Sequence, residues 1–240
     1  MRRDFSGPAR TALATHAAPS QFGDRSPETA PESLAARFHG YRAPDEPSMT
    51  AAPRTRKRPK AAPPPEAPAE GFVPLKTERL TLRPFRPDDA TDLHRLINDF
   101  DVAKMLELVR FPYQRDLADE WIAGAARDLA AGTACHLAIT GAEGAGEVLA
   151  GAVGITIDRP TRTGKLGYWV GQKFWGHGVA TEAASRLTRW AFANLDVDRI
   201  TATVADDNPA SAAVLRRAGF RQTGTGLQHF ASREIGRAHV

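Results

Sequence analysis

Apolar residues recur at helical spacing in three stretches of the chain after residue 85. The clearest is 178–194, where they lie three or four positions apart and form one face of a helix. This face consists of Ala180, Ala183, Ala184, Leu187, Ala191 and Leu195. Two further helices are predicted, one opening at 87–89 and carrying Leu93, Leu96 and Ile97, the other over 116–131.

Other stretches follow the two-residue period of strands. At 75–85, Leu80 and Leu82 alternate with Thr81 and Arg83, and 199–205 alternates in the same way. The ranges 136–140 and 147–158 are predicted to pair antiparallel across a glycine-rich turn at 141–146. A strand at 165–170 is expected to precede the long helix.

Composition divides the 240 residues near Gly71. Twelve of the 18 prolines precede this residue, whereas all four tryptophans follow it. A segment so rich in Pro and Ala cannot bury enough apolar surface to offset its ordering entropy, so residues 1–70 are predicted to be a disordered tail. Residues 71–233 suit a single domain with one core.

The tail also carries most of the excess positive charge. Residues 1–70 contain 11 Lys and Arg against 8 Asp and Glu, and the remainder of the chain is nearly balanced. A basic run at 54–60 could touch RNA, the ribosome or an anionic membrane. No aromatic residue is interleaved with these charges, which favours a solvated linker.

Two glycines, Gly176 and Gly178, lie one residue apart where the strand gives way to the long helix. The first N–H groups of a helix have no partner within it, and glycine lets an anion approach the backbone. A Walker A loop is excluded, because His177 and Gly178 stand where its Lys and Ser or Thr would be. A dinucleotide fingerprint is disfavoured because Thr181 occupies its third small position.

The pattern Lys173-x-x-Gly176-x-Gly178 resembles the acetyl-CoA pyrophosphate loop of the GNAT superfamily of N-acetyltransferases. A second landmark is Asn208-x-x-Ser211 followed by a helix that ends in Gly219-Phe220. Asn208 also suits a helix N-cap and Gly219 a position just past a helix end. The resemblance covers roughly residues 73–228. It is strongest to the RimJ and RimL subgroup of ribosomal-protein N-terminal acetyltransferases.

The resemblance implies a mixed α/β fold. Its central sheet is mostly antiparallel, splays at one parallel strand pair, here 165–170 beside 199–205, and is flanked by helices. In the family the last strand inserts between its neighbours, and here it is expected to be missing. Residues 234–240 are predicted to be a non-native extension, because they can be back-translated into a sequence like a common sequencing adapter.

The same resemblance implies transfer of acetyl from acetyl-CoA to a primary amine, without a metal. Ser211 matches the family serine near the CoA sulfur and is the candidate acid, and His229 is the nearest candidate base. Two residues depart from the family pattern: Lys165 replaces a frequent Glu, and Lys173 replaces Arg or Gln. The expected cofactor-binding residues are Val170, Lys173, Phe174, Gly176, His177, Gly178, Val179, Ala180, Asn208 and Ser211.

The acceptor stays open between a protein N-terminal amine, with the ribosome or a ribosomal protein as partner, and a small amine such as an antibiotic or polyamine. A CoA-binding module without catalysis is a further alternative. One cysteine, Cys135, excludes an internal disulfide and is expected to be buried. No apolar run approaches the roughly 20 residues that cross a bilayer, so no membrane partner and a cytoplasmic location are expected. The oligomeric state, monomer or homodimer, is not determined.

Overall fold

The computed structural model describes residues 49–51, 72–143, 146–233 and 236–239. All of them belong to one compact unit, Glu32–Val240. The basic run at 54–60 and nearly all of the predicted tail lie outside the described residues. The exception is Met49–Ala51, which forms strand β1 and therefore departs from the prediction of a disordered tail over 1–70.

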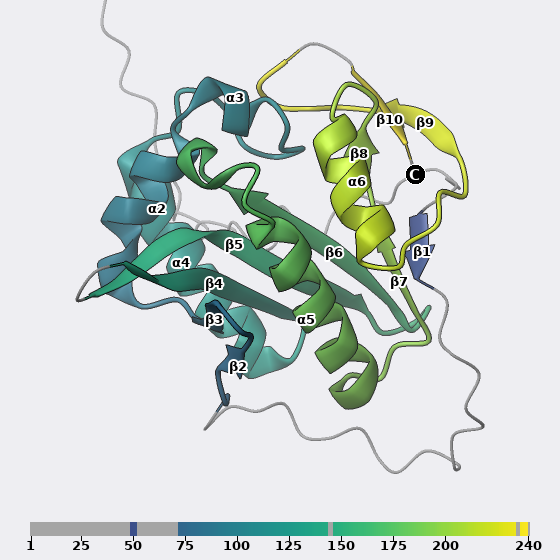
Figure 1. The fold of residues 1–240 in the computed structure, drawn as a ribbon, viewed down its shortest axis with the longest axis horizontal. Coiled ribbons are helices and arrows are strands. Elements are labelled where there is room, and N and C mark those ends of the chain that lie inside the picture. The colour runs from purple at the N-terminus through teal and green to yellow at the C-terminus, as the bar shows by residue number, and fades with distance from the viewer. Residues whose placement is uncertain (1–48, 52–71, 144–145, 234–235, 240) are drawn as a thin grey trace, which may run out of the picture. The chain divides into compact units, whose positions relative to one another are not determined.

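A seven-stranded sheet forms the centre, in the order β1-β7-β6-β5-β4-β3-β2 (Figure 1). Only β6 and β7 run parallel, and the other neighbours are antiparallel. This is the mixed sheet with one parallel pair that the family resemblance implies. Its remaining strands are β2 (Leu75–Lys76), β3 (Leu80–Pro84), β4 (Ala134–Glu143), β5 (Gly146–Asp158), β6 (Thr163–Val170) and β7 (Arg199–Ala202).

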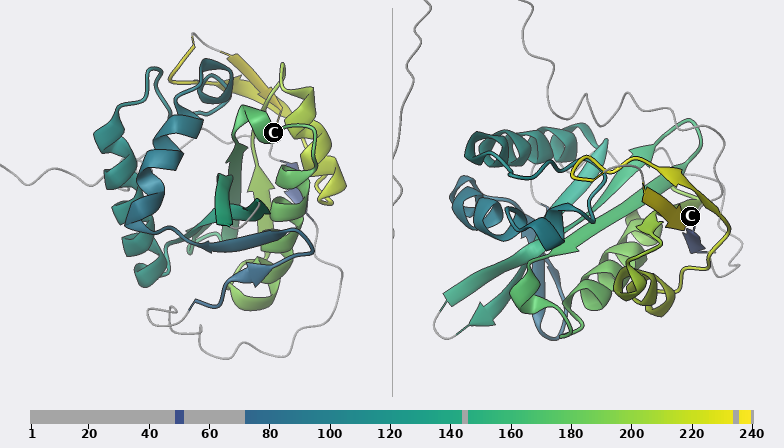
Figure 2. Two further views of the ribbon diagram at one scale, coloured as in Figure 1. Left: turned by 60° about the vertical axis from the view of Figure 1, so that its left-hand side comes forward. Right: turned by 90° about the horizontal axis from the view of Figure 1, so that it is seen from above.

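Helices cover both faces of this sheet, as Figure 2 shows. On one face α5 (Val179–Asn194) places Ala183, Ala184 and Leu187 in the main core, each fully buried. On the other face α2 (Ala90–Ile97) and α4 (Arg115–Ala131) enclose a second core. Shorter elements are η1 (Pro87–Asp89), α3 (Phe100–Ala103), η2 (Gln172–Phe174) and α6 (Pro209–Arg217).

A second, three-stranded sheet has the order β8-β10-β9. It contains β8 (Val204–Ala205), β9 (Thr225–Gln228) and β10 (Gly236–His239). The last strand thus inserts between its neighbours, so the expectation that it is missing is wrong. Gly236–His239, within the range predicted to be a non-native extension, pairs antiparallel with both β8 and β9 and forms the central strand.

Two predicted strands are each divided in the structure. A turn at Thr77 interrupts 75–85, because the Thr77 N–H donates to the Leu80 carbonyl at 2.9 Å and the Leu80 N–H donates to Thr77 Oγ1 at 2.8 Å. The stretch 199–205 separates at Thr203 into β7 and β8, which join different sheets. In 199–205 the alternation of Ile200, Ala202 and Val204 runs unbroken across Thr203, so the period of apolar residues does not reveal that division. In 75–85 the residues from Lys76 to Arg79 are all polar, and the alternation begins only at Leu80.

Two buried threonines provide a test of how hydrogen bonding supports this core. The Thr188 hydroxyl on α5 is buried and has no hydrogen-bond partner among the described residues. Thr188→Val should raise the free energy of unfolding by about 1 kcal/mol, because an unpaired buried hydroxyl is replaced by a methyl group of similar size. Urea unfolding followed by circular dichroism measures this change.

Thr140→Val is the matched control. The Thr140 hydroxyl lies 2.9 Å from the Thr81 carbonyl and 2.7 Å from Glu147 Oε1, so its loss should lower the free energy of unfolding by about 1–3 kcal/mol. Equal destabilisation by both substitutions would contradict the assignment of Thr188 as unpaired.

Candidate active site

The loop between β6 and α5 has two residues in the left-handed region. Gly176 has φ 79° and Gly178 has φ 78°, and Gly178 is the N-cap residue of α5. A side chain at either position would be strained, and a Cβ on Gly176 would meet nothing within 4 Å. The two glycines therefore shape an open, exposed turn directly before the helix.

The backbone N–H groups at this turn can bind an anion. The first intrahelical hydrogen bond of α5 runs from Glu182 N–H to the Gly178 carbonyl, at 3.0 Å. The N–H groups of Val179 and Ala180 come before that bond, and the helix dipole adds partial positive charge there. The geometry of Gly178, Val179 and Ala180 thus suits a phosphate group.

Side chains of the loop fix it against the strand and add one cation. Trp175 Nε1 donates to the Val170 carbonyl at 2.6 Å, which ties the loop to the end of β6. Lys173 is exposed, and its Nζ lies 4.6 Å from the centroid of the Phe174 ring. His177 is exposed and makes no hydrogen bond to another described residue.

Glu182 anchors the start of α5 to the turn between β2 and β3. Its Oε1 accepts from Thr77 Oγ1 at 2.5 Å, and its Oε2 accepts from Arg79 Nε at 2.9 Å and Nη2 at 2.6 Å. Burial alone would raise the pKa of Glu182, but these hydrogen bonds outweigh it and lower the pKa. We call Thr77, Arg79 and Glu182 the Glu182 cluster. Its position in the first turns of α5 agrees with a structural role.

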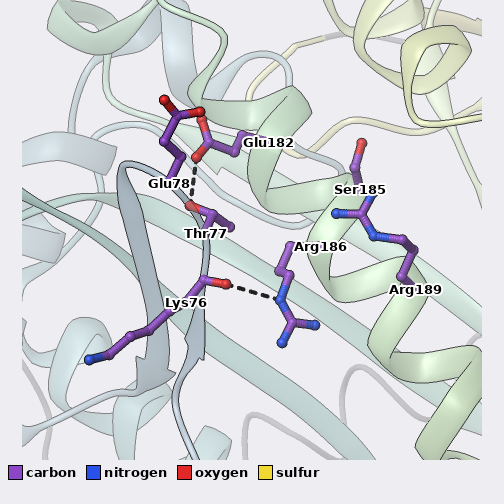
Figure 3. A pocket seen from close by; sticks show the side chains of 7 residues that line it. All are labelled: Lys76, Thr77, Glu78, Glu182, Ser185, Arg186 and Arg189. Carbon is purple, nitrogen blue, oxygen red and sulfur yellow. Dashed lines mark hydrogen bonds between the residues drawn. The ribbon is translucent and has the colours of Figure 1, made fainter.

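Thr77 and Glu182 of this cluster also line a groove between β2 and α5 (Figure 3). Arg186 Nε donates to the Lys76 carbonyl at 3.2 Å and forms a second link between these elements. The groove does not include the glycine loop. Arg79 nevertheless connects the two, because a Cβ on Gly178 would lie 3.4 Å from Arg79 Nη2.

The second landmark lies at the start of α6. Asn208 is its N-cap, as expected, and Asn208 Oδ1 accepts from the Ser211 N–H at 3.0 Å. The Ser211 hydroxyl lies 2.7 Å from the Tyr168 hydroxyl on β6. Burial raises the pKa of Tyr168 to about 12, against a smaller lowering by the hydrogen bond with Ser211. Sequence patterns gave no sign of this contact, because 43 residues separate the partners.

The remaining candidates lie nearer the α3 side. His229 directly follows β9, is exposed, and makes no hydrogen bond or ion pair with a described residue. Its role as a base stays a prediction. Lys165 Nζ pairs with Glu107 Oε2 at 3.0 Å, and the Glu107 carbonyl accepts from the Ala231 N–H at 2.9 Å. Glu107 therefore joins β6 to the segment between β9 and β10.

Three further expectations concern Cys135, metal binding and membrane-spanning segments. Cys135 is buried and burial raises the pKa of its thiol to about 12, which makes it unsuited as a nucleophile. Within the described residues, no group of three or more His, Cys, Asp or Glu is placed to hold a metal ion. The helices of the described region include none with the length and apolarity to span a bilayer.

The family model of the acetyltransferase (GNAT) domain matches residues 79–221, more than half of the chain. The chain belongs to the GNAT acetyltransferase family. This GNAT chain is 32% identical over 152 residues to "Uncharacterized N-acetyltransferase p20" of Bacillus licheniformis, covering 62% of this chain and 83% of that protein. It is 31% identical over 159 residues to "Putative ribosomal N-acetyltransferase YdaF" of Bacillus subtilis (strain 168), covering 64% and 84%.

Solved structures share the fold of this GNAT acetyltransferase. The RimL ribosomal L7/L12 alpha-N-protein acetyltransferase in complex with coenzyme A aligns with a TM-score of 0.61 at 20% identity, over 70% of this chain and 96% of that one. The microcin C7 self-immunity acetyltransferase MccE, in complex with acetyl-CoA and AMP, aligns with a TM-score of 0.58 at 23% identity, over 68% and 93%. At these identities the likeness concerns the fold alone.

The Glu182 cluster leads to a prediction on stability and pH. Glu182→Gln should lower the free energy of unfolding at pH 7 by about 2 kcal/mol, because hydrogen bonds to a charged group are lost. The folded-state pKa lies below the ordinary value of 4.5, so the carboxylate stabilises the fold fully above that pH and progressively less below it. Urea unfolding at pH 7 and pH 4 should therefore show a smaller difference between the variant and the parent at pH 4.

Glu78→Gln serves as the control, since Glu78 is exposed and has no hydrogen bond or ion pair within the described region. It should change the free energy of unfolding by less than about 0.5 kcal/mol. A difference for Glu182→Gln that stays constant from pH 7 to pH 4 would show that the charge does not stabilise the fold.

Proposed function

We propose that this GNAT acetyltransferase moves the acetyl group of acetyl-CoA to the N-terminal amine of a protein, with a ribosomal protein as the candidate substrate. The observation that carries the proposal is the glycine loop before α5. It combines two left-handed glycines, free helix N-terminal N–H groups and an exposed cation in Lys173. Such a loop suits the pyrophosphate of a CoA thioester.

The residues present suit two parts of acetyl-CoA, its pyrophosphate and its thioester. Gly176, Gly178 and the first N–H groups of α5 would hold the pyrophosphate, and Lys173 would add a positive charge. Asn208 and Ser211 lie at the start of α6, beyond the point where β6 and β7 separate, and would face the thioester. The other proposed contacts, Val170, Phe174, His177, Val179 and Ala180, belong to the same loop and helix start. When bound, acetyl-CoA supplies an activated acyl group.

The chain's own groups have three tasks in this reaction. Backbone N–H groups at the end of β6 polarise the thioester carbonyl, and Gly171 is excluded because its N–H donates to the Ala150 carbonyl at 2.9 Å. Ser211 gives a proton to the sulfur as it leaves. His229, or water, accepts the proton that the attacking amine loses.

The proposed class of acceptor follows from the weak evidence for a general base, for which His229 is the only candidate named. At pH 7 an α-amine with a pKa of about 7.8 is roughly 10 to 15% neutral, whereas a lysine side chain is about 0.04% neutral. An N-terminal amine therefore needs little help in losing its proton. The names of two similar proteins, YdaF and RimL, describe ribosomal N-acetyltransferase and ribosomal-protein acetyltransferase functions, which supports a ribosomal protein as the acceptor.

The glycine loop can be tested by one charge. Gly178→Asp should weaken acetyl-CoA binding at least tenfold, measured by isothermal titration calorimetry, because a carboxylate then lies where phosphate belongs. Gly178→Asn is the matched control, since Asn has the same shape and tolerates a positive φ. It should keep more of the affinity. Equal affinity of the Asp variant and the parent would refute the loop assignment.

The acceptor can be identified from thiol release. With acetyl-CoA at pH 7, peptides that carry a free N-terminal amine should release CoA at least tenfold faster than N-blocked peptides that carry lysine. The panel also includes polyamines and aminoglycosides. Faster release with those amines would replace the protein acceptor by a small one, and acetyl-CoA binding without release by any acceptor would indicate a non-catalytic module.

A further inference from the structure

Beyond the point where β6 and β7 stop pairing, a side-chain contact links β6 to α6. The two strands pair only from Thr163 to Lys165 on β6, opposite Arg199 to Thr201 on β7. Tyr168 lies three residues beyond the last pair. Its hydroxyl reaches Ser211 of α6, 2.7 Å from Oγ and 3.2 Å from the carbonyl oxygen.

Ser211 is thereby held at two points. Asn208 Oδ1 accepts from its N–H at 3.0 Å, which fixes the backbone, and the Tyr168 hydroxyl fixes the position of Oγ. A serine in the first turn of a helix otherwise rotates and bonds to its own backbone. The pair of contacts keeps the Ser211 hydroxyl in the space between β6 and α6.

Two hydroxyls that share one hydrogen bond have two arrangements. If Ser211 donates to Tyr168, the serine proton is consumed and Tyr168 donates to the Ser211 carbonyl. If Tyr168 donates to Ser211 Oγ, the serine proton is free for another acceptor. The 2.7 Å separation of the two hydroxyls fits either donor. Only the second arrangement leaves the Ser211 proton for the sulfur, and it replaces the longer Tyr168 contact to the Ser211 carbonyl, at 3.2 Å, by the shorter one to Oγ.

We infer that Tyr168 is a positioning residue for the transfer reaction: its hydroxyl donates to Ser211 Oγ and directs the serine proton toward the thioester sulfur. This inference rests on the proposed function. As the carbon–sulfur bond breaks, its electron pair goes to sulfur and sulfur takes the Ser211 proton. Ser211 regains a proton from solvent, while Tyr168 keeps its own and stabilises the negative charge that develops on Oγ.

The chemistry of Tyr168 is consistent with this role. Burial raises the pKa of its phenol to about 12, so the hydroxyl remains protonated and able to donate over the working pH range. The other influence on this pKa is the hydrogen bond with Ser211 itself. Tyr168 is therefore a permanent donor rather than a source of protons.

A double-mutant cycle tests the inference with the acceptor that gives the fastest CoA release. Ser211→Ala should lower kcat about a hundredfold and Tyr168→Phe about tenfold, with KM for acetyl-CoA within twofold of the parent. The double variant should match Ser211→Ala, because Tyr168 acts through Ser211. Additive losses, an unchanged kcat for either single variant, or a loss confined to KM would overturn the inference.

A second variant separates hydrogen bonding from packing. Site-specific replacement of Tyr168 by difluorotyrosine keeps the ring and makes the phenol more acidic. It should retain kcat at pH 7 and lose it at higher pH, where the phenol ionises and cannot donate. The parent and Tyr168→Phe should lack this decline, and its absence from the difluorotyrosine variant would overturn the inference.

The outcome also separates this inference from the proposed function. If the parent enzyme releases CoA with none of the acceptors, the proposed function fails and the role of Tyr168 fails with it. If the parent and Ser211→Ala behave as expected but Tyr168→Phe retains full kcat, only the role of Tyr168 is refuted.

Discussion

The parallel pairing of β6 with β7 ends after three residue pairs, and the candidate site depends on that separation. Strands that stay hydrogen-bonded along their length leave no room for a ligand between them. Here β6 continues to the glycine loop while the chain after β7 turns into a second sheet and α6. The two landmarks of the sequence therefore lie on different elements: the loop at Gly176 follows β6, and the helix start at Asn208 follows β8.

Fixed contacts at the borders hold this separation in place. On one side the Glu182 cluster attaches the start of α5 to the turn before β3, and Trp175 attaches the loop to Val170. On the other side Asn208 caps α6. Tyr168 connects the sides through Ser211, and Glu107 joins β6 to the segment before β10. A loop that binds through backbone N–H groups needs such external supports, because its glycines supply no side chains of their own.

Two charged side chains of this region, Glu182 and Lys165, make structural contacts. Glu182 is a carboxylate in the first turn of α5, and its oxygens are engaged by Thr77 and Arg79. Lys165, which replaces a frequent family glutamate, pairs with Glu107. Neither residue offers a free base. This supports a reaction that relies on backbone dipoles and on an amine that is already partly neutral at pH 7.

The sequence by itself determined the elements whose signals are local. Apolar periodicity predicted both ends of α4 and of α5 to within one residue. Asn208 marked the start of α6, and Gly176 and Gly178 marked the turn before α5, because helix capping and left-handed backbone conformations depend on the local sequence. Only the tertiary structure decided how Thr77 and Arg79 reach Glu182, how Tyr168 reaches Ser211, and that Gly236–His239 completes the second sheet. Those contacts join residues far apart in the chain, and local spacing carries no information about which distant side chains will meet once the sheet has formed.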